Sequence, residues 1–236
     1  MSALLATHGL AAFYGDFQAL FGIDFAIHAG EAVGIIGANG AGKSTFLKTV
    51  TGLLPAAPER IVFDGRPIGG LPAAAIVRRG IAMVPEGRRL FPSLSVEENL
   101  LIGGYAKRAG PWTPARVYEL FPALRELRAL PGNALSGGQQ QMVAIGRALL
   151  ANPRLLICDE ISLGLSPLVV QGLYQTLPAM MREGLTVIIV EQDVGLAQRT
   201  TSRLYCFQEG RVSLQGASSE LTRTAISAAY FGSTAA

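Results

Sequence analysis

Residues 37–44 have the types and spacing needed to bind the phosphates of a nucleotide. The stretch from Gly37 to Ser44 follows the pattern G-x-x-x-x-G-K-[ST], which is typical of a phosphate-binding loop. Its glycines allow backbone amides to approach phosphate oxygens closely. Lys43 would reach the β- and γ-phosphates, and Ser44 would place its hydroxyl on Mg²⁺. The pattern predicts a nucleoside triphosphate, but it does not separate a GTPase, a kinase, a RecA-like motor or a transport ATPase.

Two adjacent carboxylates end an apolar run further along the chain. Residues 155–158 predict a buried strand, and Asp159 and Glu160 follow it directly. The first carboxylate is placed to hold Mg²⁺ through water, and the second to accept a proton from an attacking water. A strand end followed by an acidic helix cap is the alternative, but the phosphate loop upstream favours the catalytic interpretation.

A third stretch, Leu135-Ser136-Gly137-Gly138-Gln139, opens a helix predicted from about residue 140 to 150. Its small residues expose consecutive backbone amides at a helix N-terminus, which makes a second anion site. A monomer that binds one nucleotide needs only one such site. The sequence therefore contains an anion site that the phosphate loop does not account for.

The elements that must position these residues follow from the hydrophobic pattern. The apolar run 32–36 predicts a buried strand before the phosphate loop, and residues 45–50 can continue as a helix after it. Upstream, residues 3–30 alternate apolar and polar side chains, which predicts antiparallel strands that lead to a turn at Ala29-Gly30. Further strands are expected at 60–64, 81–84, 185–190, 203–208 and 211–215, and helices at 71–79, 167–182 and 193–200.

The alternation of strands and helices argues for an α/β fold with a largely parallel sheet flanked by helices. Residues 93–130 lose the strand pattern. A capping box at Ser95–Glu98 opens a helix from 96 to about 106, and a second helix is expected at 114–130. We interpret 93–134 as a helical subdomain inserted into a core of residues 1–92 and 135–236, the whole chain 1–236 being one domain. The tail after Gly216 predicts two short helices.

The composition excludes several classes of protein. The 236 residues are half hydrophobic and carry a net charge of +3, which is too small to indicate nucleic acid as a partner. The pairs Arg78-Arg79 and Arg88-Arg89 are interpreted as a solvated face or an interface. No apolar run reaches the ~18 residues of a membrane span, and no signal peptide is expected at the N-terminus. We therefore expect a cytosolic protein.

The remaining reactive side chains are interpreted as structural. Cys158 and Cys206 lie in apolar, strand-like runs and are expected to be buried free thiols. His8 and His28 lie in the N-terminal strand patterns. Tyr14, upstream of the phosphate loop, could stack on a base, although taken alone it predicts a half-buried strand tyrosine.

Taken together, residues 37–44, 135–139 and 155–160 resemble, in order and spacing, the ATP-binding cassette (ABC) ATPases. The resemblance covers essentially the whole chain from Tyr14. It implies a P-loop NTPase cassette with a mixed, largely parallel core sheet, an N-terminal antiparallel β portion and an inserted helical subdomain, and it implies ATP and Mg²⁺ as cofactors. In that family two cassettes pack head to tail, with ATP between the phosphate loop of one and the signature sequence of the other. The extra anion site is then the signature.

The resemblance also implies a role for each matching residue. The catalytic set is Glu160, Gln192 and Lys43. Mg²⁺ is assigned to Ser44, Asp159 and Glu86. The nucleotide is assigned to Tyr14, which matches the aromatic that stacks on adenine, and to Gly37, Asn39, Gly40, Ala41, Gly42, Lys43, Ser44, Thr45, Ser136, Gly137, Gly138 and Gln139.

Four positions depart from the general cassette pattern. Glu86 stands where most cassettes have glutamine, Gln192 where most have histidine, Ser166 where most have aspartate, and Ile161 where a proline usually follows the glutamate. Glutamine can donate a hydrogen bond to phosphate but cannot shuttle protons, so slower hydrolysis is expected. The stretches V-P-E-G-R, V-E-Q and S-L-G-L, together with 140–149 and 229–232, resemble one of the two ATP-binding subunits of branched-chain amino acid importers.

This second resemblance implies an energy-coupling subunit of a bacterial importer for branched-chain or other hydrophobic amino acids. The implied partners are a second cassette, identical or paralogous, two transmembrane permease subunits and, indirectly, an extracytoplasmic solute-binding protein, with no nucleic acid. The chain would be peripheral at the cytoplasmic face of the membrane. Importers of amides, urea or aromatic acids, a soluble ABC ATPase acting on DNA or ribosomes, and an ATP sensor that does not hydrolyse remain the alternatives.

Overall fold

The structure is a computed structural model that describes residues 2–231. The chain forms two compact units, and each is described by itself. The first contains the residues up to Ile76 together with those from Thr186 onward, and the second is Val77–Leu185. Within residues 2–231, no helix is long and apolar enough to cross a lipid bilayer.

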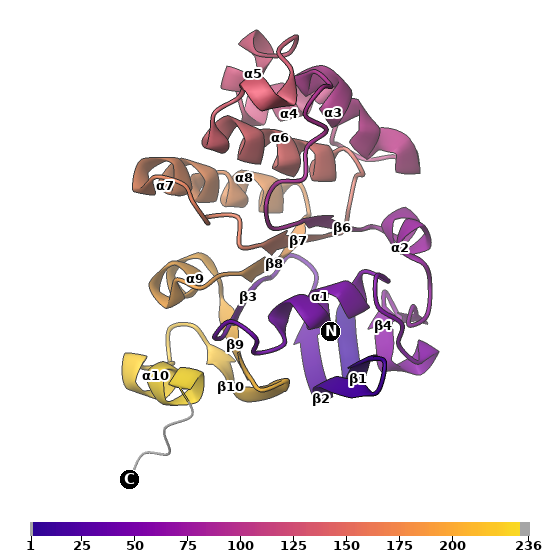
Figure 1. Ribbon diagram of the computed structural model, residues 1–236, viewed down its shortest axis with the longest axis vertical. Coiled ribbons are helices and arrows are strands. Elements are labelled where there is room, and N and C mark those ends of the chain that lie inside the picture. Colours follow the sequence, from indigo (N-terminus) through magenta and orange to yellow (C-terminus); the bar gives the residue numbers. More distant parts are fainter. Residues whose placement is uncertain (1, 232–236) are drawn as a thin grey trace. The chain divides into compact units, whose positions relative to one another are not determined.

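The first unit begins with an antiparallel sheet, as the alternating pattern predicts (Figure 1). Its long hairpin pairs β1 (Leu5–Tyr14) with β2 (Phe17–Ile27), from Leu5↔Ile27 at one end to Tyr14↔Phe17 at the turn. The short strands β4 (Ile61–Phe63) and β5 (Arg66–Pro67) extend the sheet in the order β2-β1-β4-β5. The 3₁₀ turn η1 (Pro58–Arg60) precedes β4.

The same unit contains a mixed, largely parallel set of strands that carries the phosphate loop. β3 (Ala32–Ile36) pairs in parallel with β8 (Thr186–Val190) on one side and β9 (Arg203–Gln208) on the other, and β10 (Arg211–Ala217) is antiparallel to β9. All five residues of β3 and of β8 are buried, as strands covered on both faces require. The helices are α1 (Lys43–Val50), α9 (Val194–Thr200) and α10 (Arg223–Phe231), and α2 (Ala73–Arg79) spans the point where the units divide.

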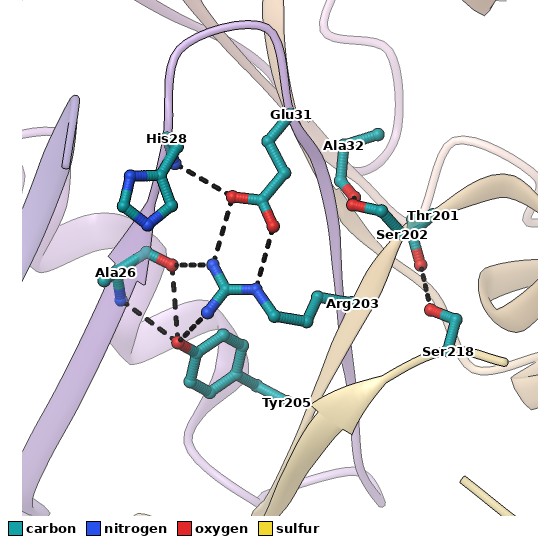
Figure 2. Close-up of polar contacts among 9 residues, drawn as sticks. All are labelled: Ala26, His28, Glu31, Ala32, Thr201, Ser202, Arg203, Tyr205 and Ser218. Carbon is teal, nitrogen blue, oxygen red and sulfur yellow. Dashed lines mark hydrogen bonds and ion pairs between the residues drawn. The ribbon is translucent and has the colours of Figure 1, made fainter. Parts of the chain in front are cut away.

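A partly buried ion pair links the strands of this unit (Figure 2). The Arg203 guanidinium on β9 donates two hydrogen bonds to the Glu31 carboxylate, at 2.8 and 3.1 Å, and one to the Ala26 carbonyl at 2.7 Å. It also lies 3.3 Å from the Tyr205 hydroxyl. The Glu31 carboxylate accepts a further bond from the His28 amide at 2.9 Å. One side chain thus links the end of β2, the β2–β3 turn and β9.

The second unit combines two parallel strands with helices. β6 (Ile81–Val84) pairs with β7 (Leu155–Asp159). Helix α3 (Val96–Gly103) packs on α6 (Gly137–Leu149), and a Cβ on Gly146 would lie 2.7 Å from Leu100 and from Val117, so this close approach needs glycine. The helical elements are α3 (Val96–Gly103), η2 (Gly104–Ala106), α4 (Pro114–Leu120), α5 (Ala123–Glu126), η3 (Gly132–Ala134), α6 (Gly137–Leu149), α7 (Pro167–Gln175) and α8 (Leu177–Arg182).

The strands at 81–84 and 203–208 and the capping box at Ser95 are confirmed. The single helix predicted at 114–130 is wrong, because the chain leaves helical geometry at Phe121, just before Pro122. The single helix at 167–182 is also wrong: it breaks at Thr176, two residues before a proline that cannot donate a backbone bond.

Two further predictions meet the described residues only in part. Within residues 2–231 the tail after Gly216 contains one helix, α10, where two were predicted, and the motif that ends at Gly232 runs past the described residues. The helices of 93–134 lie in the second unit with β6 and β7. Their status as a separate subdomain stays a prediction.

Candidate functional site

The phosphate loop connects the buried strand β3 to α1, as predicted. Gly42 is the N-cap of α1, has φ of 102°, and makes no side-chain capping bond, so the first-turn amides are left to another acceptor. Gly37 has φ of 151°, and a Cβ there would collide with the Phe207 carbonyl oxygen. The loop can follow this path only with glycine at these positions. A helix N-terminus with no side-chain cap fits an anionic group such as phosphate.

The Lys43 ammonium lies within the curve of this loop. Its Nζ donates to the Gly37 carbonyl at 2.6 Å and to the Ala38 carbonyl at 3.1 Å, and the residue is only 5% exposed. Burying a cation is costly unless polar partners compensate, and here loop carbonyls are among the partners. The loop therefore holds a positive charge beside the N-terminus of α1, where a phosphate would be attracted.

Tyr14, at the end of β1, points to the first turn of α1. Its hydroxyl lies 3.5 Å from Thr45 Oγ1, and the Lys48 ammonium lies over its ring, 5.9 Å from the centroid. Tyr14 is the last residue of β1 and is 44% exposed, so part of its ring is open to a ligand. The structure brings this ring and the phosphate loop to the same helix, as stacking on the base of a loop-bound nucleotide requires.

Gln192 belongs to the same unit. It follows β8, whose Val190 pairs with Ile35 of β3, so the chain leaves both parallel strands at the same edge of the sheet. Gln192 is exposed and lines a cavity of about 600 Å³ together with side chains of α9 and α10, among them Arg199, Arg223 and Tyr230.

In the second unit, the signature stretch forms the start of α6. Ser136 is the N-cap: its hydroxyl accepts from the Gln139 amide at 3.4 Å, while the Gln139 side chain accepts from the Ser136 amide at 2.8 Å. The S-x-x-Q spacing is a capping-box signal that our sequence analysis did not use, and the helix consequently starts at Gly137, not near 140. A Cβ on Gly138 would lie 2.7 Å from Val169.

Arg88 is a neighbour of the signature that sequence reasoning missed. Its Nη1 donates to Gln140 Oε1 at 3.4 Å, and a Cβ on Gly137 would lie 3.2 Å from its Nη2. The Arg147 guanidinium, whose pKa is lowered by burial, donates to the Arg88 carbonyl at 3.1 Å. Arg88 has a left-handed backbone, φ 64°. Arg88 ends the V-P-E-G-R stretch, but that resemblance assigned it no role, and the pair Arg88-Arg89 was interpreted only as a solvated face or an interface.

The two carboxylates lie at the end of β7. Asp159 is the last strand residue and is 9% exposed. Glu160 has φ of 48°, a left-handed conformation that costs a non-glycine residue roughly 1 kcal/mol or more. Because β6 and β7 are parallel, with Val84 opposite Cys158, Glu86 lies beyond the same strand edge as Asp159.

The predicted site residues thus gather in two groups. Tyr14, the phosphate loop and Gln192 belong to the first unit, whereas Glu86, the signature, Asp159 and Glu160 belong to the second. Within residues 2–231 there is no cluster of three or more His, Cys, Asp or Glu side chains that could hold a metal. Cys158 and Cys206 are both buried and not joined in a disulfide, as predicted.

Comparison with known proteins identifies the family. The chain matches the ABC transporter family over residues 20–162. It is 41% identical to the high-affinity branched-chain amino acid transport ATP-binding protein BraG of Pseudomonas aeruginosa, over 97% of this chain and 100% of that protein. It is 32% identical to the probable branched-chain amino acid transport ATP-binding protein LivF of Archaeoglobus fulgidus, over 92% and 94% of the two chains.

A solved structure gives the same assignment. A dimeric ATP-binding cassette in a post-hydrolysis state, bound to ADP and phosphate, superposes with a TM-score of 0.80 at 25% identity, over 90% of this chain and 98% of that one. The sequence motifs, the mixed sheet with its antiparallel portion and these matches agree. This chain belongs to the ABC transporter family and is one of its ATP-binding cassettes, an ATPase.

Proposed function

We propose that this cassette is the energy-coupling subunit of a bacterial importer for branched-chain or other hydrophobic amino acids. The observation that carries the proposal is the 41% identity to BraG, which extends over nearly the whole of both chains. The stretches around Glu86, Gln192 and Ser166 support it, because they depart from the general cassette pattern and resemble the same branch.

In this proposal the first unit binds the nucleotide. The loop amides and the buried Lys43 ammonium hold the β- and γ-phosphates, and Tyr14 stacks on the adenine. Gln192 donates a hydrogen bond to the γ-phosphate. The signature residues Ser136, Gly137 and Gly138 contact the γ-phosphate of the nucleotide bound to the partner cassette. The placement of Tyr14 and Lys43 around α1 supports these roles.

Glu160 is the proposed general base, which takes a proton from the attacking water. Mg²⁺ is a hard cation that prefers oxygen donors and neutralises phosphate charge when bound. Ser44, Asp159 and Glu86 offer a hydroxyl and two carboxylates that suit it. ATP binding would close a cassette dimer, and hydrolysis would reopen it.

The catalytic assignment is tested with Glu160→Gln, which keeps the shape of the side chain but cannot accept the proton. We expect steady-state ATP hydrolysis to fall by about 10²- to 10⁴-fold, while an ATP-bound dimer accumulates in size-exclusion chromatography. Glu209→Gln is the matched control, because Glu209 is exposed and has the same left-handed backbone, φ 47°. Hydrolysis by Glu160→Gln at the wild-type rate would refute the assignment of the base.

The transport assignment is tested by purifying the chain from its native membranes in mild detergent and identifying every co-purifying protein. We expect a second cassette, identical or paralogous, two polytopic permeases and, through them, a solute-binding protein at the far side of the membrane. Uptake of leucine or valine by the reconstituted complex, and not of urea or amides, would support the cargo. A soluble set of nucleic-acid or ribosomal partners would overturn the importer.

A further inference from the structure

We propose that Phe17 is a second base-binding residue, which forms with Tyr14 a two-ring site for the purine of the nucleotide. Tyr14 stacks on a face of the base, and Phe17 covers an edge that water would otherwise contact. This inference rests on the proposed ATP-binding function. It adds a residue that the sequence motifs do not include.

The pairing register places the two rings on one face of the β1–β2 hairpin. Tyr14 is directly opposite Phe17, and side chains of directly paired residues lie on the same face with Cβ atoms about 4.5–5.5 Å apart. Along β1, Tyr14 lies two residues after the buried Ala12 and so on the same face, although the pairing shifts by one residue on β2 between these positions. The Tyr14 hydroxyl, 3.5 Å from Thr45 Oγ1, shows that this face borders α1. Tyr14 and Phe17 therefore lie on the core-facing side of the hairpin, but near its turn, where both rings are exposed.

That face borders the phosphate loop. A Cβ on Gly42 would lie 3.0 Å from Leu20 Cδ2, so the start of α1 packs directly against β2. The turn after β9 connects the two as well, since the Gly210 amide donates to the Ala41 carbonyl at 3.0 Å and the Phe21 amide donates to the Gly210 carbonyl at 2.9 Å. A nucleotide whose phosphates lie at α1 would extend along this side of the hairpin.

Phe17 is unusually exposed for this position. Its side chain is 71% exposed, more than that of Tyr14 at 44%, although both lie on the core-facing side. A large apolar ring on the core-facing side gains most when a flat apolar surface covers it. The Lys48 ammonium lies over the Tyr14 ring. A base at this site would therefore meet the Tyr14 ring with its neighbouring cation, and the Phe17 ring on the paired strand.

Phe13 provides a matched control within the same hairpin. It is the same residue type, is 48% exposed, and lies next to Tyr14 in the chain. It pairs with Gln18, however, which places it on the opposite face of the hairpin, away from α1. Removing its ring changes the exposed apolar surface of the hairpin without touching the proposed base site.

The test measures the dissociation constants of ATP and of inorganic tripolyphosphate, which has no base, for each purified variant. We expect Phe17→Ala to weaken ATP binding about 2- to 10-fold, the range of a single aromatic contact, and to leave tripolyphosphate binding unchanged. Phe17→Tyr should restore ATP affinity. Phe13→Ala should bind both ligands as the wild type does. Thermal unfolding of each variant checks that the hairpin is folded.

Each other outcome has a distinct meaning. Unchanged ATP affinity in Phe17→Ala, with a loss in Tyr14→Ala, refutes the inference and leaves the proposed function intact. An equal loss for ATP and tripolyphosphate, or an equal loss in Phe13→Ala, shows a disturbed hairpin and also refutes a base contact. Failure of the wild-type protein to bind ATP overturns the proposed function itself.

Discussion

Replacing Arg203 with alanine should destabilise the first unit strongly. The substitution removes both bonds to Glu31 and the bond to the Ala26 carbonyl (Figure 2). It leaves the Glu31 carboxylate, whose side chain is 17% exposed, with its bond from the His28 amide but without its cation. A largely buried charge that loses its partner is costly, because water can replace only part of the lost interaction.

The size of the effect follows from the burial of the pair. Breaking a fully buried ion pair costs about 3–5 kcal/mol, and the 29% exposure of the Arg203 side chain puts this pair at the lower end, about 3 kcal/mol. For a chain of this size each kcal/mol lowers Tm by roughly 2–4 °C. We therefore expect Tm to fall by roughly 6–12 °C, measured by far-ultraviolet circular dichroism.

Arg116 is the control, because its side chain is 47% exposed and one of its partners, Glu119, is 54% exposed, so water screens these charges more than those of Arg203 and Glu31. Arg116→Ala should lower Tm far less than Arg203→Ala. The double variant Arg203→Ala/Glu31→Gln should be more stable than the sum of the two single losses predicts, because the second substitution removes the unpaired carboxylate. Equal shifts for Arg203→Ala and Arg116→Ala, or strictly additive losses, would refute the argument.

Two further predictions concern the strands around the phosphate loop. Gly37→Ala should abolish ATP binding in a titration, because its Cβ would collide with the Phe207 carbonyl oxygen, whereas Gly65→Ala, which also has positive φ but open space around it, should bind normally. Burial raises the pKa of the Cys206 thiol, although a hydrogen bond with Ser213 and the charge of Lys43 oppose this. The unfolded chain therefore loses the thiol proton first, and stability should fall as pH rises above the ordinary thiol pKa of about 8.5. In Cys206→Ala, Tm should decline less between about pH 8 and 10 than in the wild type. Parallel curves of Tm against pH for the wild type and the variant would contradict the assignment of this decline to the Cys206 thiol.

The sequence predicted the parts of the site that are local in the chain. The phosphate loop, the strand before it and the carboxylates after residues 155–158 each depend on neighbours a few positions away, so glycine spacing and apolar runs reveal them. The ion pair between Glu31 and Arg203 joins residues 172 positions apart, and no local pattern specifies it.

Backbone conformation is the second feature that the sequence did not predict. Arg88, which contacts the signature helix, has a positive φ of 64° that arginine does not favour, and neither the conformation nor the contact is visible in the sequence. The break at Phe121-Pro122 was different. Pro122 is visible in the sequence, and its steric effect on the preceding residue outweighs the helical pattern on both sides.

The contact between Arg88 and α6 bears on how cassettes can be recombined. In this chain Arg88, in the loop after β6, contacts Gln140 and Gly137 of the signature helix. A chimaera that takes the signature helix from a relative but keeps this loop would place Arg88 against residues that are not matched to it. Arg147 makes the dependence mutual, because it lies on that helix and holds the Arg88 carbonyl. The loop after β6 and the signature helix must therefore be exchanged together for the cassette to keep this contact, although about fifty residues separate them in the chain.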